Sequence, residues 1–483
     1  MFIPGQYGVD QIMEIRKAFE ANTAEGGATP FVDPSSGATL SMQSLDKTFV
    51  AITSTDKDFS FLNQAPKRNV NQVLAEYNKQ KSHGGGWYNS SHMGQSDEPI
   101  FRDAVLKRLY DEICYIGEGF AVNKPSETVD NVADPSLVQG NSALRRGMEN
   151  LQRSIWFGNK STNKLTQNGF LKKVLDADST FVEDCRGQLP AVDLIKDHTA
   201  SVRTKYMGIV NDMWMHNNTK ALYDQLYDDN AKTFVWQNAS QNPGNAGAGN
   251  IIRGIYDSNA NDEMIRFKTD IWMDKHNWGV PMVLNEDTGI LVEGPTSATE
   301  SPETPVLALG VPAANPLSKF VAADAGVYQY RVSSGTNRHW SQACAIESAT
   351  LAAGQSVELT ITPQAGIPAT RHVIFRSIAP GSTDVRYMKE VADSGGGTTV
   401  YTDKNDDIPG TTIMVLGDFN SRSDSDENRT HVLSELLPFT KTLFPYGSGG
   451  KFRMKHGMVE AYLVMQILTE EKFRVFKNVP VRK

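Results

Sequence analysis

The stretch DPSLVQGNSALRRGMENLQRSIWFG, residues 134–158, sets the scale of the predicted fold. Asp134 is a preferred helix-capping residue, Pro135 suits the first helical turn, and Gly158 is a natural stop. Between these ends one apolar stripe recurs at helical spacing: Leu144, Met148, Leu151 and Ile155. Polar residues, Gln152 among them, are expected to face away. A helix of this length with one apolar stripe is typical of a helix that lies across a sheet.

The composition is that of an ordinary globular protein with a sizeable core. The 483 residues correspond to roughly three domains of average size. Hydrophobic residues make up 39% of the chain and charged residues 22%. The net charge of −8 gives no indication of a protein that is held on nucleic acid by a basic face.

Cysteine usage and the absence of sorting signals predict a protein made in a cytoplasm. Cys114, Cys185 and Cys344 are odd in number and far apart, which favours a reducing compartment over a disulfide framework. The N-terminal residues lack the basic and apolar regions of a signal peptide. The longest apolar stretch near the end, AYLVMQIL, is too short to span a bilayer. We therefore expect no membrane segment.

The chain before residue 134 is predicted to contain an arm and a long two-limbed loop. Residues 9–21 fit a short amphipathic helix, and the Gly-, Ser- and Pro-rich residues after it fit an extended arm. From residue 69 to 122 two limbs surround the turn KSHGGGWYNSSH, residues 81–92. The first limb can place one set of side chains on a single face: Val73, Ala75 and Tyr77. The periodicity of the second limb fits a helix or a strand equally.

After residue 158 the pattern changes from helical to β. Residues 189–230 are predicted to be mainly helical and 237–250 to be a loop. After a Pro- and Thr-rich linker near residue 300, turn signals separate six β-patterned segments: 326–334, 341–348, 356–363, 371–377, 385–392 and 398–403. This spacing predicts a β-sandwich of immunoglobulin or fibronectin type at 303–408, without the Cys and Trp pattern of disulfide-bonded domains. The tail, residues 411–483, is predicted to add strands that complete the domains begun before the insertion.

Motifs for acyl or phosphoryl chemistry are incomplete. His83 and the three glycines after it are similar to the oxyanion strip of some lipases, but no G-x-S-x-G elbow occurs in the chain. The stretch FGNKST, residues 157–162, lacks the glycine spacing of a phosphate loop. A hydrolase built around His83 is therefore disfavoured, and no catalytic residue is assigned.

No metal or cofactor site is predicted either. The sequence has no H-E-x-x-H and no paired C-x-x-C, and His83 and His92 lack a third fixed ligand. Residues 403–410 begin like a calcium loop, but Ile408 and Met414 stand where an EF-hand needs glycine and glutamate. A chain of this size without a chemical constellation is more often a structural or binding protein than an enzyme.

The order of these elements resembles the tailed-phage major capsid protein family (the Hong Kong 97 fold), in the branch that carries an Ig-like insertion. Five stretches are similar to family segments. In chain order they are the passage from arm to loop at 45–67, the C-terminal half of the spine helix at 144–159, the exit from the insertion at 400–418, and the closing strands at 431–445 and at 462–468 with 473–481. The resemblance runs from about residue 41 to the end. It is cumulative, because shell proteins have no single diagnostic motif.

The resemblance implies an α+β capsid fold with a long spine helix, an axial domain, an N-terminal arm and an extended loop, plus an inserted all-β sandwich. The implied divisions are an N-terminal arm at 1–65, an extended loop with flanking strands at 66–122, a peripheral domain with the spine helix at 123–185, an axial domain at 186–302, an Ig-like insertion at 303–408 and closing strands at 409–483.

The implied function is that of a major capsid protein that self-assembles into hexamers and pentamers of an icosahedral phage head around double-stranded DNA. A separate scaffolding protein and a portal are the implied partners, and the virion, assembled in the host cytoplasm, is the implied location. The alternatives are an encapsulin-like cellular shell protein and, with less support, an Ig-domain tail or adhesion protein. No enzymatic activity is implied.

The resemblance implies that the glycine-rich turn is the tip of a loop that contacts a neighbouring subunit. The tip residues expected in that contact are Lys81, His83, Trp87, Tyr88 and His92. Some relatives join subunits covalently through lysine and asparagine. That chemistry is not carried over to Lys79 or Lys81, because no partner asparagine or activating glutamate can be identified.

Overall fold

The computed structural model describes most of the chain. The described residues are 54–84, 92–95, 98–99, 101–128, 134–226, 253–260, 263–284, 290–395, 397–419, 429–447 and 453–482. The helix expected at 9–21 and the loop expected at 237–250 lie outside them. Helices and strands are both abundant, as expected for an α+β fold. No helix in the described ranges combines the length and the apolar character that crossing a bilayer requires.

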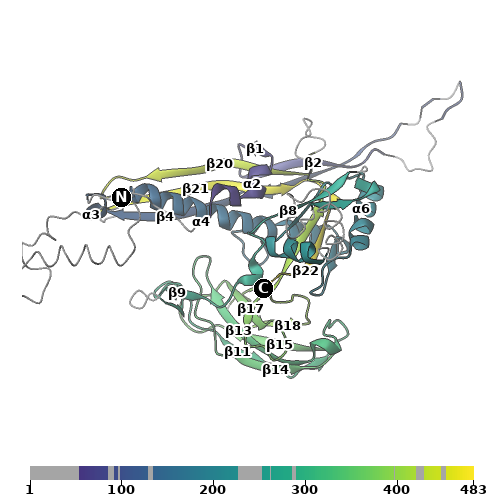
Figure 1. Ribbon diagram of the computed structural model, residues 1–483. Coiled ribbons are helices and arrows are strands. Elements are labelled where there is room, and N and C mark those ends of the chain that lie inside the picture. Colours follow the sequence, from purple (N-terminus) through teal and green to yellow (C-terminus); the bar gives the residue numbers. More distant parts are fainter. Residues whose placement is uncertain are drawn as a thin grey trace, which may run out of the picture.

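The long helix α4 (Pro135–Phe157) has the predicted ends. The Asp134 side chain accepts a hydrogen bond from the Ser136 backbone N–H at 2.8 Å, and the Gly158 N–H closes the last turn on the Ser154 carbonyl. In Figure 1 the helix runs along a long sheet with the strand order β1-β20-β21-β4. Its strands are β1 (Lys67–Asn69), β20 (His431–Leu443), β21 (Met454–Ile467) and β4 (Cys114–Asn123).

The face that α4 buries is wider than the apolar stripe. Leu151 and Ile155 are fully buried, whereas Leu144 and Met148 are partly buried. Small residues share the buried face, and a β-carbon on Gly147 would lie 3.1 Å from the Phe439 ring. The helix therefore approaches the sheet closely. The expectation that Gln152 faces away is wrong, because this side chain is fully buried and bonded to a buried carboxylate.

A second sheet of six strands lies at one end of α4 (Figure 1). Its order is β5-β22-β19-β6-β8-β7. The strands are β5 (Val182–Asp184), β22 (Phe473–Pro480), β19 (Thr411–Gly417), β6 (Asp212–Met215), β8 (Met264–Thr269) and β7 (Gly254–Tyr256). Successive residues of β19 enter different hydrophobic clusters: Ile413 and Val415 join the one that holds α4, whereas Met414 and Leu416 join the other. Burial on both faces explains the unbroken apolar run.

Helices accompany this sheet. Helix α5 (Phe170–Ala177) contributes Phe170 to the cluster shared with α4. Helix α6 (Val192–Tyr206) contributes Ile195 and Val202 to the other cluster. Residues 217–226 are helical. The mainly helical prediction for 189–230 therefore fits its described residues except for strand β6.

Residues 306–403 form two antiparallel four-stranded sheets below the body in Figure 1, here called the two-sheet unit. One sheet contains β11 (Val306–Leu309), β12 (Ala313–Ala314), β15 (Gln355–Thr362) and β18 (Thr399–Asp403). The other has the order β14 (Glu347–Leu351), β13 (Gly326–Gly335), β16 (Arg371–Ser377), β17 (Val385–Ala392). Residues of both sheets share one hydrophobic cluster. The predicted segment 341–348 is a strand only from Glu347 onward.

Candidate functional site: the β2–β3 ribbon and its anchor

The two limbs around the glycine-rich turn form a two-stranded antiparallel ribbon that leaves the body (Figure 1). It consists of β2 (Leu74–Ser82) and β3 (Val105–Glu112), so the ambiguous second limb is a strand. One face turns toward the body: Ala75 is buried, and Tyr77 and Lys79 are partly buried. Ala75 and Tyr77 share a face as predicted, but Val73, just before β2, is exposed.

A small apolar cluster holds the base of the ribbon. Ala75, Ile113 and Val464 are each at most 2% exposed and touch one another. Because Ala75 lies on β2 and Val464 on β21, their burial joins the ribbon to the long sheet. An isolated two-stranded ribbon is at best marginally stable in water, so the base depends on this support.

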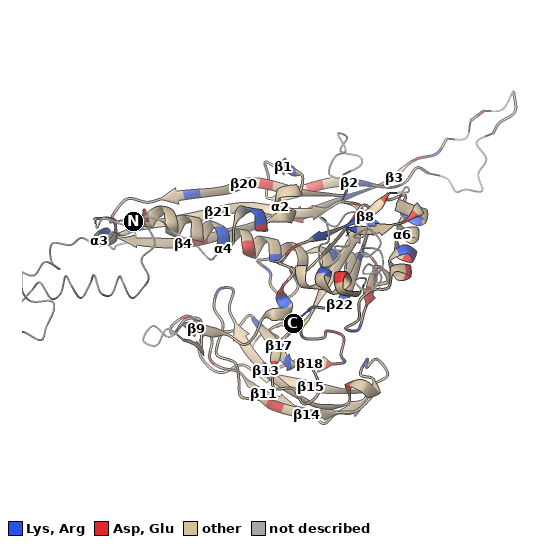
Figure 2. Cartoon of the chain, viewed as in Figure 1, with Lys and Arg blue, Asp and Glu red and all other residues tan. Residues whose placement is uncertain are grey.

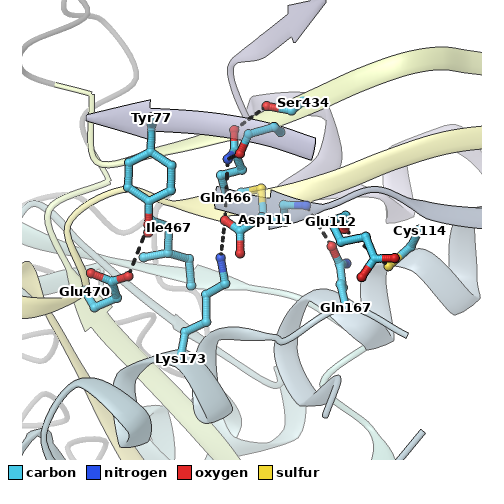
Figure 3. Close-up of polar contacts among 12 residues, drawn as sticks. Tyr77, Asp111, Glu112, Cys114, Gln167, Lys173, Ser434, Gln466, Ile467 and Glu470 are labelled. Atoms are coloured by element: carbon cyan, nitrogen blue, oxygen red, sulfur yellow. Dashed lines mark hydrogen bonds and ion pairs between the residues drawn. The ribbon is translucent and has the colours of Figure 1, made fainter. Parts of the chain in front are cut away.

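A buried glutamine specifies where β2 lies. Gln466, on β21, donates from Nε2 to the Ala75 carbonyl at 2.8 Å. Its Oε1 accepts from Ser434 Oγ at 2.6 Å and from Arg68 Nη2 at 2.7 Å. Figure 3 shows Gln466 and Ser434 in this arrangement. Buried polar groups are costly without partners, so shifting β2 along the sheet would leave the amide unsatisfied.

Ion pairs hold β2 to the turn after β21. Lys79 Nζ lies 2.7 Å from Glu470 Oε2 and also pairs with Glu471. Burial alone would lower the pKa of Lys79, but the hydrogen bonds to both glutamates outweigh it and the pKa is raised. The Tyr77 hydroxyl donates to Glu470 Oε1 at 3.4 Å, as Figure 3 shows. Burial, aided by the Glu470 charge, raises the pKa of Tyr77, so the phenol stays neutral.

The partner strand β3 is held to the body as well. Lys173, on α5, lies 2.7 Å from Asp111 Oδ2, and Lys160 pairs with Glu112 (Figure 3 shows the Lys173–Asp111 contact). Burial raises the pKa of the neighbouring Cys114 thiol to about 11, so this cysteine is not an activated nucleophile. Both strands of the ribbon are therefore tied to the body by charged groups at their base.

On the face that turns away from the body, the ribbon exposes large hydrophobic side chains. Leu106 and Tyr110 are each 67% exposed, and Phe101 is 90% exposed. Leu74, Leu106 and Tyr110 alternate on the face that turns away from the body. On the same face Arg108, paired with Asn78, lies between Leu106 and Tyr110. The ribbon thus has one face held by the body and an opposite face on which large apolar side chains remain exposed.

The predicted tip residues fall only partly within the described ranges. Lys81 is exposed at the end of β2, and His83 and His92 are exposed, with His83 Nδ1 hydrogen-bonded to Gln80 Nε2 at 3.1 Å. Trp87 and Tyr88 lie outside the described residues. Gly84 has φ +79°, and a β-carbon there would lie 2.4 Å from the Asp103 carbonyl oxygen, so this turn position requires glycine.

The anchor residues were not found by sequence reasoning. Gln466 is some 390 residues from Ala75, and Glu470 is as far from Lys79. No local pattern marks such partners, although the acidic pair after a strong strand pattern was a usable signal. Among the residues that the structure describes, no group of three metal-ligating side chains occurs.

Comparisons with known proteins give structural likenesses only. No protein-family model matches the sequence, and no curated protein matches it. The capsid of an empty GTA particle is 10% identical over 94% of this chain and 100% of that chain, with a TM-score of 0.42. A chain of Gordonia phage Cozz is 6% identical over 94% and 96%, with a TM-score of 0.42.

An encapsulin is also similar. The holo-SrpI encapsulin complex from Synechococcus elongatus is 8% identical over 92% of this chain and 95% of that chain, with a TM-score of 0.38. Each of these matches spans nearly the whole of both chains at 10% identity or less.

Proposed function

We propose that the chain is the major capsid protein of a tailed phage and builds the hexamers and pentamers of an icosahedral head around double-stranded DNA. The observation that carries the proposal is the β2–β3 ribbon, which is held by the body on one face and exposes Leu106 and Tyr110 on the other, with Phe101 exposed before β3. A monomeric protein gains nothing from such a projection. A subunit that lays it on a neighbour buries apolar surface in every copy.

Symmetry turns a modest contact into a stable assembly. A standard protein interface buries about 1,600 Å² in total, and one ribbon supplies only part of it. In a closed shell each subunit gives and receives the same contact, so the contacts reinforce one another. Figure 2 shows acidic and basic residues interspersed along the elements in view, and the net charge is −8. A shell of this kind encloses DNA without binding it by sequence.

The remaining assignments belong to the same proposal. The two-sheet unit corresponds to the Ig-like insertion at 303–408, and residues 1–65 to the N-terminal arm. A separate scaffolding protein and a portal are the expected partners, the virion is the expected location, and assembly takes place in the host cytoplasm. The role is structural, with no catalytic residue and no cofactor.

Electron microscopy and native mass measurement of the expressed chain, with and without the phage's scaffolding protein, test the proposal. Closed shells or capsomers are the expected products. A strictly monomeric chain under both conditions would overturn it. Shells that hold a cargo protein instead of DNA when purified from the native source would favour the encapsulin-like alternative.

A matched pair of variants tests whether the ribbon makes the contact. Leu106→Ser should reduce shell yield at least tenfold and leave the subunit folded. Val400→Ser, at an exposed position of β18 in the two-sheet unit, is the control and should assemble normally. Equal assembly of both variants would remove the ribbon from the interface. Trp87→Ala, at the predicted tip, should likewise weaken the shell without unfolding the subunit.

A further inference from the structure

The segment 270–278, between β8 and β9 (Met282–Leu284), touches two parts of the molecule that are otherwise distinct. On one side it contacts the C-terminal half of α4. On the other side it contacts β17 of the two-sheet unit. We call this segment the strut.

The contact with α4 is made of charged and aromatic groups. Asp270 is buried and accepts hydrogen bonds at Oδ2 from Gln152 Nε2 at 2.6 Å and from Trp156 Nε1 at 2.7 Å. Arg153 binds Asp274 through two nitrogens, at 2.9 and 3.1 Å, and stacks 4.7 Å from the Trp272 ring centroid. A bidentate pair with a stacked guanidinium is a geometrically specific contact.

The contact with β17 combines main-chain and side-chain bonds. The Tyr387 N–H donates to the Trp278 carbonyl at 2.7 Å, a main-chain bond between β17 and the strut. The rings of these two residues lie 5.7 Å apart in an edge-to-face arrangement. Arg386 Nη1 donates to Asn277 Oδ1 at 3.1 Å. The two-sheet unit is thus bonded to the strut by backbone as well as by side chains.

One ammonium group bridges the two sides. Lys275 Nζ lies 5.6 Å from the ring centroid of Phe157 on α4 and 5.0 Å from that of Tyr387 on β17. The Trp278 ring is 5.4 Å away, and the Tyr387 hydroxyl is 3.4 Å away. A desolvated cation is attracted to the faces of aromatic rings. Removing either ring would leave the Lys275 ammonium attracted from one side only, and the link between α4 and β17 would weaken. Burial lowers the pKa of Lys275, in keeping with this enclosure.

We propose that the strut couples the C-terminal turn of α4 to the two-sheet unit, so that displacement of the helix end is transmitted to the unit instead of being absorbed at a hinge. A second contact also ties the two-sheet unit to the body: Lys319 Nζ, in the chain after β12, lies 2.7 Å from Asp184 Oδ2 on β5. Packed contacts of this kind pass displacement on because they are not continuously deformable. The coupling does not depend on the proposed function.

Hydrogen exchange of the full chain tests the coupling. Tyr387→Leu should speed the exchange of the amides of residues 153–157 on α4 at least tenfold, although Tyr387 is on the other side of the strut. Coupling between sites is reciprocal. Arg153→Gln should therefore speed the exchange of the Tyr387 amide, which is bonded to the Trp278 carbonyl.

Two further variants keep the test decisive. Tyr401→Leu, at another partly buried tyrosine of the two-sheet unit, is the matched control and should leave exchange in α4 unchanged. If Tyr387→Leu does not fold, Trp278→Leu removes the same ring contact at a residue that is 38% exposed, and the same result is expected. Unchanged α4 exchange in the folded strut variant, or an equal change in Tyr401→Leu, would overturn the proposal.

Discussion

The ribbon and the strut both lie at the edge of the body, but the strut is packed between two parts of the chain and the ribbon is packed on one face only. The ribbon is held by the body on one face, through Gln466 and Lys79 among other contacts, and exposes Leu106 and Tyr110 on the other. The strut is bonded at both sides, and its aromatic rings are packed against α4 and β17. The difference teaches which of the two is internal packing. The aromatic rings of the strut are packed within the chain, whereas the exposed side chains of the ribbon leave one of its faces available to another molecule.

The strongest test of this difference compares two leucines. Leu151 on α4 is 1% exposed, so Leu151→Ala should cost about 4 kcal/mol of unfolding free energy through lost burial and a cavity. Leu106→Ala, on the ribbon, should cost less than about 0.5 kcal/mol. Chemical denaturation of the dissociated subunit measures both. A large loss of subunit stability in Leu106→Ala would mean that the distal ribbon packs within its own chain.

Acid should weaken the body and the strut. Burial first, and then the His216 ring, lowers the pKa of His276 to about 4; burial and then Lys268 lower the pKa of His431 to about 4. Both imidazoles are neutral in the folded chain and take up a proton more readily once unfolded. Their stabilisation is therefore complete above pH 6.5, falls progressively below it, and is lost as the pH passes 4.

The loss should be roughly 3 kcal/mol for each of the two histidines. His276 faces Asp274 on the strut and Arg386 on β17 as well as His216, and neither of its ring nitrogens has a hydrogen-bond partner among the described residues. Denaturation at pH 7, 6, 5 and 4 measures the loss. His276→Phe should flatten part of the pH dependence, and an unchanged slope in that variant would contradict the assignment.

Local patterns were enough for elements whose signals lie within them. The ends of α4 follow from Asp134 and Gly158, and β16 follows from an apolar run between turn signals. Gln152 was misplaced because its partner, Asp270, is 118 residues away in the sequence. The segment that carries Asp270 covers the side of α4 that the sequence pattern alone assigns to water. Periodicity also left residues 105–122 open, since the pairing of β3 with β2 and of β4 with β21 decides them.

The anchor of the ribbon could not be predicted for the same physical reason. A lysine near a turn usually points into solvent, and only the folded chain places two glutamates beside Lys79. The distal surface was easier to anticipate. A glycine-rich turn between two limbs with little core of their own indicates a projection, even though the tip residues Trp87 and Tyr88 remain predictions.

Removing the buried amide should loosen the ribbon base specifically. Gln466→Leu leaves the Ala75 carbonyl and the Ser434 hydroxyl without their partner, at a cost of about 2 kcal/mol. Hydrogen exchange should rise in β2 and β3 and not in the strut. Gln80→Leu, at an exposed position on β2, is the control and should change stability by less than about 0.5 kcal/mol. Faster exchange throughout the chain would mean that Gln466 supports the whole body.

The smallest expected effect concerns the charge clamp. Lys79→Met keeps most of the apolar stem but removes the ammonium between Glu470 and Glu471, and we expect a loss of about 1 kcal/mol. The loss is modest because Lys79 is paired across the ribbon with Lys107, whose like charge is relieved at the same time. Lys107→Met, on the exposed neighbour, relieves the same repulsion without breaking the clamp and should be neutral or slightly stabilising. The difference between the two variants should largely persist in high salt, because the partly buried clamp is screened less than exposed charge. If Lys79→Met and Lys107→Met were indistinguishable in ribbon exchange at low salt, the clamp would contribute nothing. The base would then be held by Gln466, the apolar cluster and the ion pairs of Lys173 and Lys160.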